Sequence, residues 1–264
     1  MTFKKAIGVI FVIGGLFLGA ILTGCGSNST KIYPTAEAQY RAAMDQYHSN
    51  KFQLAADGLQ KVIFNFSGSS LVDSAQYYMA MSHFNDGDFY LAANEFEHLA
   101  NGFPGSPLVD DAVYMAGLCY FKSAPDHYGL DQQELNKAIE LLSGFIIDYP
   151  QSELVPDAQE AIRQARDRLA HKYYEAGRLY FRGKYYKSAE IYFQNVIDLY
   201  TDTDWAARSL YYLAELARKQ DNFDKAREMF SNFLVVYPEH ELAKEANHKI
   251  SEIKEEVAKS EESK

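Results

Sequence analysis

FQLAA at residues 52–56 returns as FYLAA at 89–93, and FSGSSLVD at 66–73 returns as FPGSPLVD at 103–110. The stretch Phe52–Phe121 therefore contains one pattern twice, at an offset of 37 residues. A repeat of this length is typical of solenoid and array proteins. A single unit of such an array cannot bury its own apolar face, and it does so only by stacking against its neighbours.

The pattern extends to five units, each with an alanine at the same place in its second predicted helix: Ala55, Ala92, Ala138, Ala189 and Ala226. Apolar residues follow each alanine after four and seven positions, which lie on one face of a helix. Four of the alanines have a small residue twelve positions before them: Ala43, Ala80, Gly177 and Ala214. In the third unit Gly117 takes this place, and nine further residues intervene.

This spacing of small residues resembles the tetratricopeptide repeat. In that repeat two helices cross at the small positions, where only Gly or Ala lets the backbones approach. Proline often follows the second helix, which it cannot continue. Only 7 prolines occur in the chain, and few segments alternate apolar and polar residues, which favours helices. We expect an all-α fold, a right-handed solenoid of five tetratricopeptide-like helix pairs.

Two insertions interrupt the period. Unit three gains nine residues in the loop Lys122–Glu134, and fourteen more residues precede unit four. The apolar residues of Glu153–Tyr180 keep helical spacing, and fourteen residues add about four helical turns. We therefore expect unit four to begin with an overlong helix that divides units 1–3 from units 4–5. Its charged residues, with Arg163 and Arg166 as candidates, form either a solvated face or a contact with a partner.

A tyrosine stands three residues before the small residue of every unit: Tyr40, Tyr77, Tyr114, Tyr174 and Tyr211. Tyrosine suits recognition, because it offers a large rigid surface with one polar tip. The alternative is that each ring packs between units. We assign Tyr40, Tyr77 and Tyr114 as candidate peptide-groove residues, and Tyr174 and Tyr211 as candidate partner contacts.

Residues 1–24 look like a bacterial lipoprotein signal peptide, with Lys4 and Lys5 before an apolar run that ends in Leu22-Thr23-Gly24-Cys25. The resemblance implies cleavage before Cys25, a thioether-linked diacylglycerol on its sulfur and a further acyl chain on the new amine, enough for stable anchoring. An uncleaved membrane helix is the alternative, which the glycines of the run and the final motif disfavour. Gly26, where Asp is absent, implies export to the outer membrane with the protein on its periplasmic face. We expect residues 25–34 to form a flexible tether.

Composition and motifs argue against several kinds of function. A net charge of −10 disfavours binding to nucleic acid or to anionic lipid. The sequence has no metal-ligand spacing, nucleophile motif or phosphate loop. Asp126, His127 and Asp131 form one loop cluster of note, and we expect Cys119 to be a buried apolar residue. We therefore expect a binding protein, not an enzyme, with no metal and no cofactor beyond the lipid on Cys25.

The segments at the interruptions carry a more specific resemblance. YGLDQQ at 128–133, YPQS at 149–152 and RQARDRLA at 163–170 resemble the BamD family of outer-membrane lipoproteins, and the likeness covers essentially all of the mature chain. Two features depart from that family, namely Thr201 at a place where Pro is usual and a polar tail over 252–264, which we expect to fray. The expected divisions are units 1–3 over 35–152, and units 4–5 with a C-terminal helix over 153–251.

The resemblance implies a periplasmic scaffold of the β-barrel assembly (BAM) machine. Units 4–5 would bind the POTRA domains of a BamA-like barrel protein, and units 1–3 would offer a groove to unfolded outer-membrane proteins, especially their C-terminal strands. Other assembly lipoproteins are further expected partners. The alternative is another periplasmic repeat lipoprotein, such as a CpoB-like envelope coordinator or a secretin pilot. A CpoB-like protein would need room for a coiled coil before Thr35, and a pilot would not need the insertion before unit four.

Overall fold

The computed structural model describes residues 33–262, and this part of the chain forms eleven α-helices and no strand. Residues 1–32 and 263–264 lie outside the described residues, and with them the predicted signal peptide, Cys25 and most of the tether. The helices are α1 Ala36–His48, α2 Phe52–Asn65, α3 Val72–Asp86, α4 Phe89–Gly102, α5 Val109–Ser123, α6 Gln133–Asp148, α7 Val155–Arg182, α8 Tyr186–Leu199, α9 Asp204–Lys219, α10 Phe223–Val236 and α11 Ala243–Glu262.

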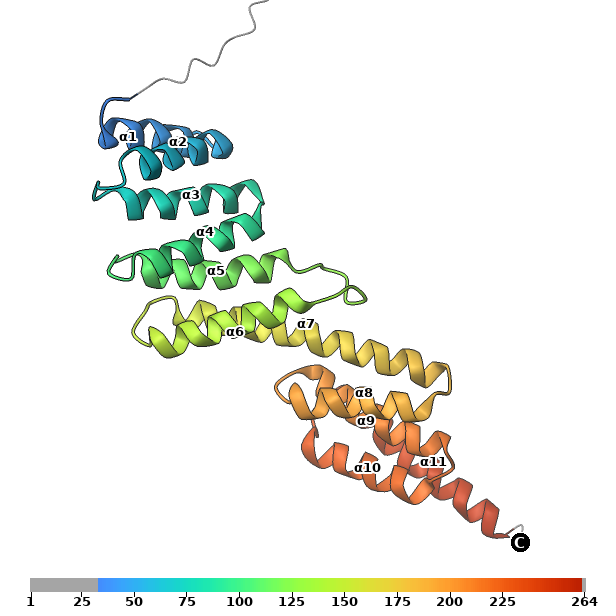
Figure 1. The fold of residues 1–264 in the computed structure, drawn as a ribbon. Coiled ribbons are helices and arrows are strands. Elements are labelled where there is room, and N and C mark those ends of the chain that lie inside the picture. The colour runs from blue at the N-terminus through green and yellow to red at the C-terminus, as the bar shows by residue number, and fades with distance from the viewer. Residues whose placement is uncertain (1–32, 263–264) are drawn as a thin grey trace, which may run out of the picture. The chain divides into compact units, whose positions relative to one another are not determined.

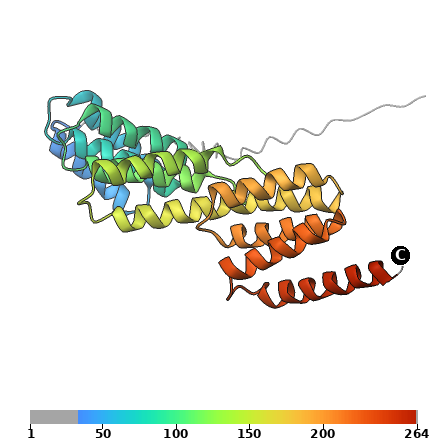
Figure 2. The ribbon, with the colours of Figure 1, turned by 90° about the horizontal axis from the view of Figure 1, so that it is seen from below.

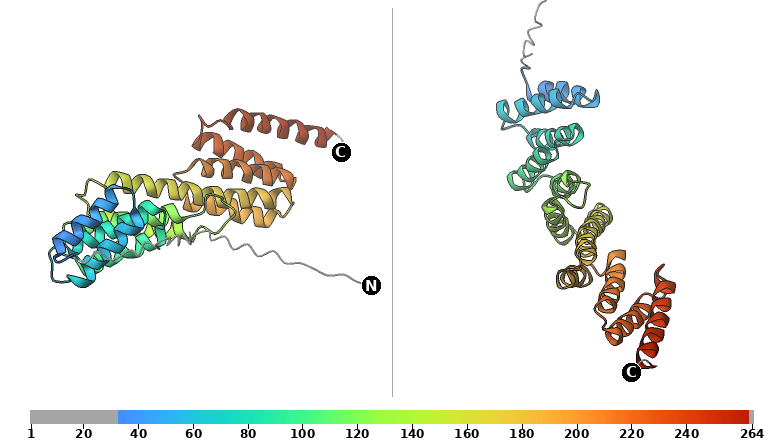
Figure 3. Two further views of the ribbon diagram at one scale, coloured as in Figure 1. Left: turned by 90° about the horizontal axis from the view of Figure 1, so that it is seen from above. Right: turned by 90° about the vertical axis from the view of Figure 1, so that its right-hand side faces the viewer.

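The first ten helices form the five predicted pairs, and α11 packs against the last of them. Each helix packs mainly against the next one along the chain, so the pairs follow one another in chain order (Figure 1). Figure 3 (right) views several pairs nearly end-on and shows the same succession. The all-α solenoid expected from the repeats is confirmed.

Each pair is held at a crossing where one helix has no room for a larger side chain. The five repeat alanines are all 0% exposed. A Cβ atom added to Gly117 would lie 2.7 Å from the Leu142 side chain, and one added to Gly177 would lie 2.7 Å from the ring of Phe193. Both distances are too short for real contacts. The small residues are therefore required by the close approach of the two helices.

Four of the five hairpin turns share one backbone conformation. Two residues before the aromatic that opens the second helix, the chain adopts a positive φ at Asn50, Gly87, Lys184 and Asp221. Gly87 adopts this conformation easily, but the lysine does so at a steric cost. In unit three the longer loop between α5 and α6 replaces the tight turn.

The linkers between pairs repeat a side-chain bond. The hydroxyls of Ser69, Ser106 and Ser152 accept hydrogen bonds from the backbone N–H two residues later, at 3.2–3.4 Å. In the last linker Nδ1 of His240 accepts the same bond from Leu242. The linkers after units one, two, three and five thus turn the chain into the next helix with one of their own side chains.

The overlong helix is α7, whose 28 residues compare with 13 to 16 in α1–α6 and α8–α10. It packs against α5 and α6 on one side and against α8 and α9 on the other. Figure 2 shows its N-terminal part beside α6 and its C-terminal part beside α8. The predicted long helix over Glu153–Tyr180 is confirmed, with both ends two residues later.

The polar tail corrects one expectation. We expected residues 252–264 to fray, but α11 continues through this segment to Glu262. Ile253 is 1% exposed, and Val257 packs against the same cluster as Phe230 and Phe233. These apolar residues continue the spacing of Ala246 and Ile250 along one face. Helical packing against α10 therefore decides the structure of the tail, although its composition is highly charged.

Substituting Gly177 with Ala tests the crossing in unit four. We expect Gly177→Ala to lower the free energy of unfolding by about 1–3 kcal/mol, because the new methyl group meets the buried ring of Phe193. Gly144→Ala is the matched control, since Gly144 lies in α6 with nothing within 4 Å of its added Cβ. That variant should gain roughly 0.5–1 kcal/mol from helix propensity. Urea unfolding measures both, and equal effects would contradict the crossing.

Candidate partner-binding surface

The tyrosines of units four and five are packing residues. Tyr174 and Tyr211 are 4% and 5% exposed, so the assignment of their rings as partner contacts is wrong for this structure. Tyr174 packs on Phe193, Trp205 and Tyr212, while Tyr211 meets Phe230 at a centroid distance of 5.3 Å. Burial raises the pKa of both hydroxyls. For these two tyrosines the alternative given above, that the ring packs inside the array, is the one observed.

The tyrosines of units one to three are half-buried. Tyr77 packs edge-on against Phe96 at 5.6 Å, and Tyr114 lies 5.8 Å from the ring of Phe145. Burial is the main reason why the pKa of Tyr40 and of Tyr77 is raised to about 12. Tyr77 and Tyr114 therefore pack on the second helix of their own units, and all three tyrosines keep part of their surface accessible. Their assignment to a peptide groove stays a prediction.

The two arginines predicted as partner contacts differ in their surroundings. The side chain of Arg163 is 63% exposed and pairs only with Glu160, one turn earlier on α7. Arg166 instead holds both carboxylate oxygens of Asp202 and donates to the carbonyl of Leu199 at 2.9 Å. These bonds lower the pKa of the Asp202 carboxyl. Arg166 thus ties α7 to the linker after α8, and only Arg163 remains open to a partner.

The inserted loop between α5 and α6 is fastened to α7. Arg168 donates to the carbonyls of Ala124 and Pro125 at 3.2 and 2.5 Å, and Nζ of Lys172 donates to the carbonyl of Leu130 at 2.8 Å. The side-chain amide of Gln132 closes the loop with bonds to the carbonyls of Pro125 and His127. The sequence left two roles open for the charged residues of α7, a solvated face or a partner contact. Arg168 and Lys172 instead hold this loop.

A stack of rings connects the same loop to unit five. Tyr128 lies 4.7 Å from His171 of α7, and His171 lies nearly parallel to Trp205 of α9 at 4.2 Å. Trp205 in turn contacts Tyr174 at 5.1 Å. The sequence offered one sign of this stack, since Trp205 is the only tryptophan of the chain. Periodicity could not reveal it, because the rings come from three separate elements.

The overlong helix leaves one of its faces uncovered. Leu135, near the start of α6, shares a buried cluster with Ala165 and Leu169, so α6 covers α7 only in its first half. Figure 1 shows α7 running on past α6. There Tyr128 and, along one helical face, Lys172, Ala176, Leu179 and Arg182 line a hollow of about 250 Å³, which Gly129 and Glu175 complete. We call the first five of these residues the α7 ledge.

The α7 ledge combines apolar and cationic groups. Leu179 is 62% exposed and Tyr128 is 37% exposed, so two large side chains stand open at the same hollow. Lys172 and Arg182 stand at its edges. A surface with an apolar centre and a charged rim is typical of a protein–protein contact. The ledge is therefore the candidate surface for a protein partner.

The residues singled out for possible chemistry have structural roles where they are described. Over 33–262 no group of three His, Cys, Asp or Glu side chains could hold a metal ion. Asp131 accepts a bond from the backbone of Gln132, and Nδ1 of His127 accepts one from Gly129, so this loop cluster serves its own turns. Cys119 is 0% exposed, and burial raises its thiol pKa to about 12. In the same range no helix is long and apolar enough to span a bilayer.

Comparison with known families agrees with this architecture. Residues 34–220 match the family model YfiO, which is described as "Outer membrane lipoprotein". The chain belongs to the YfiO family. Residues 208–240, which cover most of α9, all of α10 and part of the last linker, also match a tetratricopeptide-repeat model. The YfiO match includes both the inserted loop and the whole of α7, the two features that depart from a regular repeat.

Solved structures of repeat proteins are also similar to this YfiO-family chain. A TPR repeats protein from Bacteroides fragilis is 13% identical with a TM-score of 0.47, and the match covers 84% of this chain and 99% of that one. The complex of the TPR2AB domain of yeast Sti1 with pHSP90 is 14% identical with a TM-score of 0.46, covering 84% of both chains. No curated protein matches the chain.

Arg168→Ala tests whether the inserted loop is fastened as described. The substitution removes the donor of two carbonyl bonds, and hydrogen bonds from a charged group contribute about 1.5–3 kcal/mol. We expect the amides of 124–132 to exchange hydrogen at least about tenfold faster, as measured by mass spectrometry. Arg163→Ala, on the same helix but 63% exposed, is the control and should leave that exchange unchanged. Equal exchange in both variants would mean that the loop is held by other contacts.

Proposed function

We propose that this chain is an outer-membrane-anchored periplasmic scaffold of the β-barrel assembly (BAM) complex. In this role it binds a BamA-like barrel protein through the POTRA domains of that partner. The proposal rests on membership in a family of outer membrane lipoproteins and on a tetratricopeptide architecture, which presents binding surfaces rather than catalytic groups. The anchor is the lipid on Cys25, which holds the array at the periplasmic face.

The observation that carries the proposal is the α7 ledge. It lies at the junction between units 1–3 and unit four, where two insertions that a regular repeat lacks come together. Fourteen extra residues of helix create the uncovered face, and the inserted loop supplies Tyr128 beside it. The loop is held by Arg168 and Lys172, so the ledge is formed before a partner arrives. A preformed surface loses less entropy on binding.

The remaining units supply a second part of the role. Tyr40, Tyr77 and Tyr114 keep partly accessible rings in units one to three, and we propose that this half meets unfolded outer-membrane proteins, with other assembly lipoproteins as further partners. An extended chain with alternating apolar side chains would suit such rings. This assignment is independent of the α7 ledge, which lies beyond α6.

Leu179→Asp tests the ledge as the contact with the barrel partner. Burying a leucine side chain contributes about 1.5–3 kcal/mol, so its loss should lower the affinity for a purified POTRA segment at least about tenfold. Surface plasmon resonance with the purified chain measures the change. Leu54→Asp is the matched control, because Leu54 is 49% exposed on α2 of unit one.

The two variants distinguish the alternatives. Loss of binding in Leu179→Asp alone supports the ledge. Loss in Leu54→Asp alone would place the contact on units 1–3 and reverse the assigned polarity. Absence of any POTRA binding by the unmodified chain would favour the other class of protein, a repeat lipoprotein that coordinates the envelope or serves a secretin.

Counting thiols tests the anchor. The chain has 2 cysteines, and Cys119 is 0% exposed. A thioether on Cys25 would leave one free thiol, and its burial protects it from thiol reagents in the folded protein. We expect no reaction in the native membrane-derived protein and one thiol per chain in guanidinium. Two reactive thiols in guanidinium would show that Cys25 carries no lipid, and protein made without the signal segment gives the two-thiol reference.

A further inference from the structure

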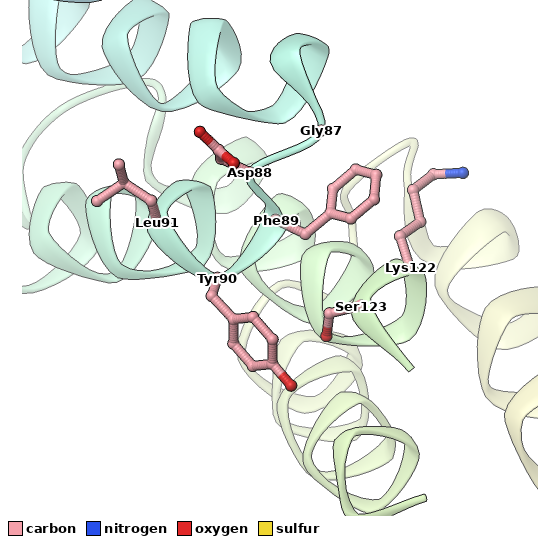
Figure 4. Close-up of a pocket in the computed structure, with 7 residues that line it drawn as sticks. All are labelled: Gly87, Asp88, Phe89, Tyr90, Leu91, Lys122 and Ser123. Atoms are coloured by element: carbon pink, nitrogen blue, oxygen red, sulfur yellow. The ribbon is translucent and has the colours of Figure 1, made fainter. Parts of the chain in front are cut away.

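Two neighbouring hollows lie where the start of α4, the end of α5 and the start of α6 meet. The larger, of about 540 Å³, is lined by Gly87–Leu91 together with Lys122 and Ser123 (Figure 4). The smaller, of about 290 Å³, is lined by Tyr90, Tyr120, Gln133, Glu134 and Lys137. Tyr90 borders both. The floor is the end of α5, and the walls are the starts of α4 and α6.

The smaller hollow has an acidic and aromatic lining. Tyr90 is 54% exposed, and its hydroxyl donates to Oε1 of Glu134 at 2.6 Å. The rings of Tyr90 and Tyr120 meet edge to face at 6.4 Å. Glu97 of α4 lies near enough to Tyr120 for its charge to add to burial in raising the pKa of that hydroxyl. The Glu134 carboxylate and two aromatic rings therefore line this space, and Glu97 lies beside Tyr120 without lining it.

Each carboxylate has an oxygen without a donor. Oε2 of Glu134 and Oε1 of Glu97 are both shielded from solvent and accept no hydrogen bond. A buried acceptor left in this state costs free energy, more so when it is charged. The larger hollow, by contrast, is lined by Phe89 and Leu91, which offer apolar contacts beside it.

The two lysines that line these hollows do not donate to the open carboxylate oxygens. Nζ of Lys137 lies 3.4 Å from Glu140, on the next turn of α6, and not at either open oxygen. Figure 4 shows the Lys122 side chain extending away from Tyr90, at the far side of Phe89. With a net charge of −10, the chain as a whole also attracts cationic partners.

We infer that the smaller hollow binds the arginine side chain of an extended partner polypeptide, with an apolar neighbour of that arginine in the larger hollow. A guanidinium has five N–H donors in a fixed plane and can satisfy carboxylate oxygens while it stacks on an aromatic ring. Lysine has a single ammonium and no planar face for the rings. The inference rests on the part of the proposed function that gives extended chains to units 1–3, and it names the side chain that units two and three would recognise; it is independent of the POTRA contact.

Binding of a defined peptide to the full chain tests the inference. The probe is a fluorescein-labelled Gly-Ala-Leu-Arg-Leu-Ala amide, followed by fluorescence anisotropy. We expect saturable binding, and we expect the citrulline peptide, which keeps the shape but not the charge, to bind at least about tenfold more weakly. The probe contains no POTRA sequence, so its failure would leave the proposed function standing.

Matched variants assign the site. Glu134→Gln should raise Kd at least about tenfold, while Glu228→Gln removes the same charge from an exposed position on α10 and should leave Kd unchanged. Tyr90→Ala should raise Kd about fivefold with no change of charge, against Tyr185→Ala, whose ring is 68% exposed elsewhere. Circular dichroism checks that each variant is folded.

Four outcomes would overturn the inference. The first is no saturable binding of the arginine peptide by the unmodified chain. The second is equal weakening in Glu134→Gln and Glu228→Gln, which would mean general attraction to an acidic protein. The third is equal affinity for the arginine and citrulline peptides. The fourth is equally tight binding of a peptide with lysine in place of the arginine, which would mean that the planar guanidinium has no role.

Discussion

The close crossing of two helices within each pair is the constraint on which this structure depends. Ala55 and its four equivalents are fully buried, and the glycines of units three and four have no space for a methyl group. Backbones that approach so closely place the aromatic and aliphatic residues of the second helix directly beneath the first. Those residues, such as Phe193 and Phe230, then form the surface on which the next unit packs. Because each unit covers the apolar face of its neighbour, an isolated helix pair would leave that face exposed to water.

Regular stacking also explains why the functional surfaces lie at irregular places. In a regular array the outer face of each first helix is covered by the preceding unit. α7 escapes this rule because it is longer than α6, and its uncovered half becomes the α7 ledge. The hollows beside Tyr90 have a similar origin. The inserted loop joins Ser123 at the end of α5 to Gln133 at the start of α6, where the other units have a tight turn.

The repeat made most of the fold predictable from the sequence. Ala92 and Leu99 could be placed in the core because identical spacing recurs five times, and the long helix followed from apolar residues at helical intervals. The tail was wrongly expected to fray, because composition hides the few apolar residues that face α10. The positive φ of Lys184 was equally hidden, since a glycine stands beside it and only the backbone reveals which residue turns.

The tyrosines show why the site was harder to predict than the fold. Tyr40 and Tyr174 occupy the same place in their units, yet one is half-buried and the other 4% exposed. The difference comes from the following unit, which lays Trp205 and Tyr212 over Tyr174. Repeat position determines which way a side chain points, but the side chains that the following unit lays over it determine whether it stays accessible. Accessibility therefore has to be judged from how each unit packs on the next, because the repeat position alone is the same for Tyr40 and Tyr174.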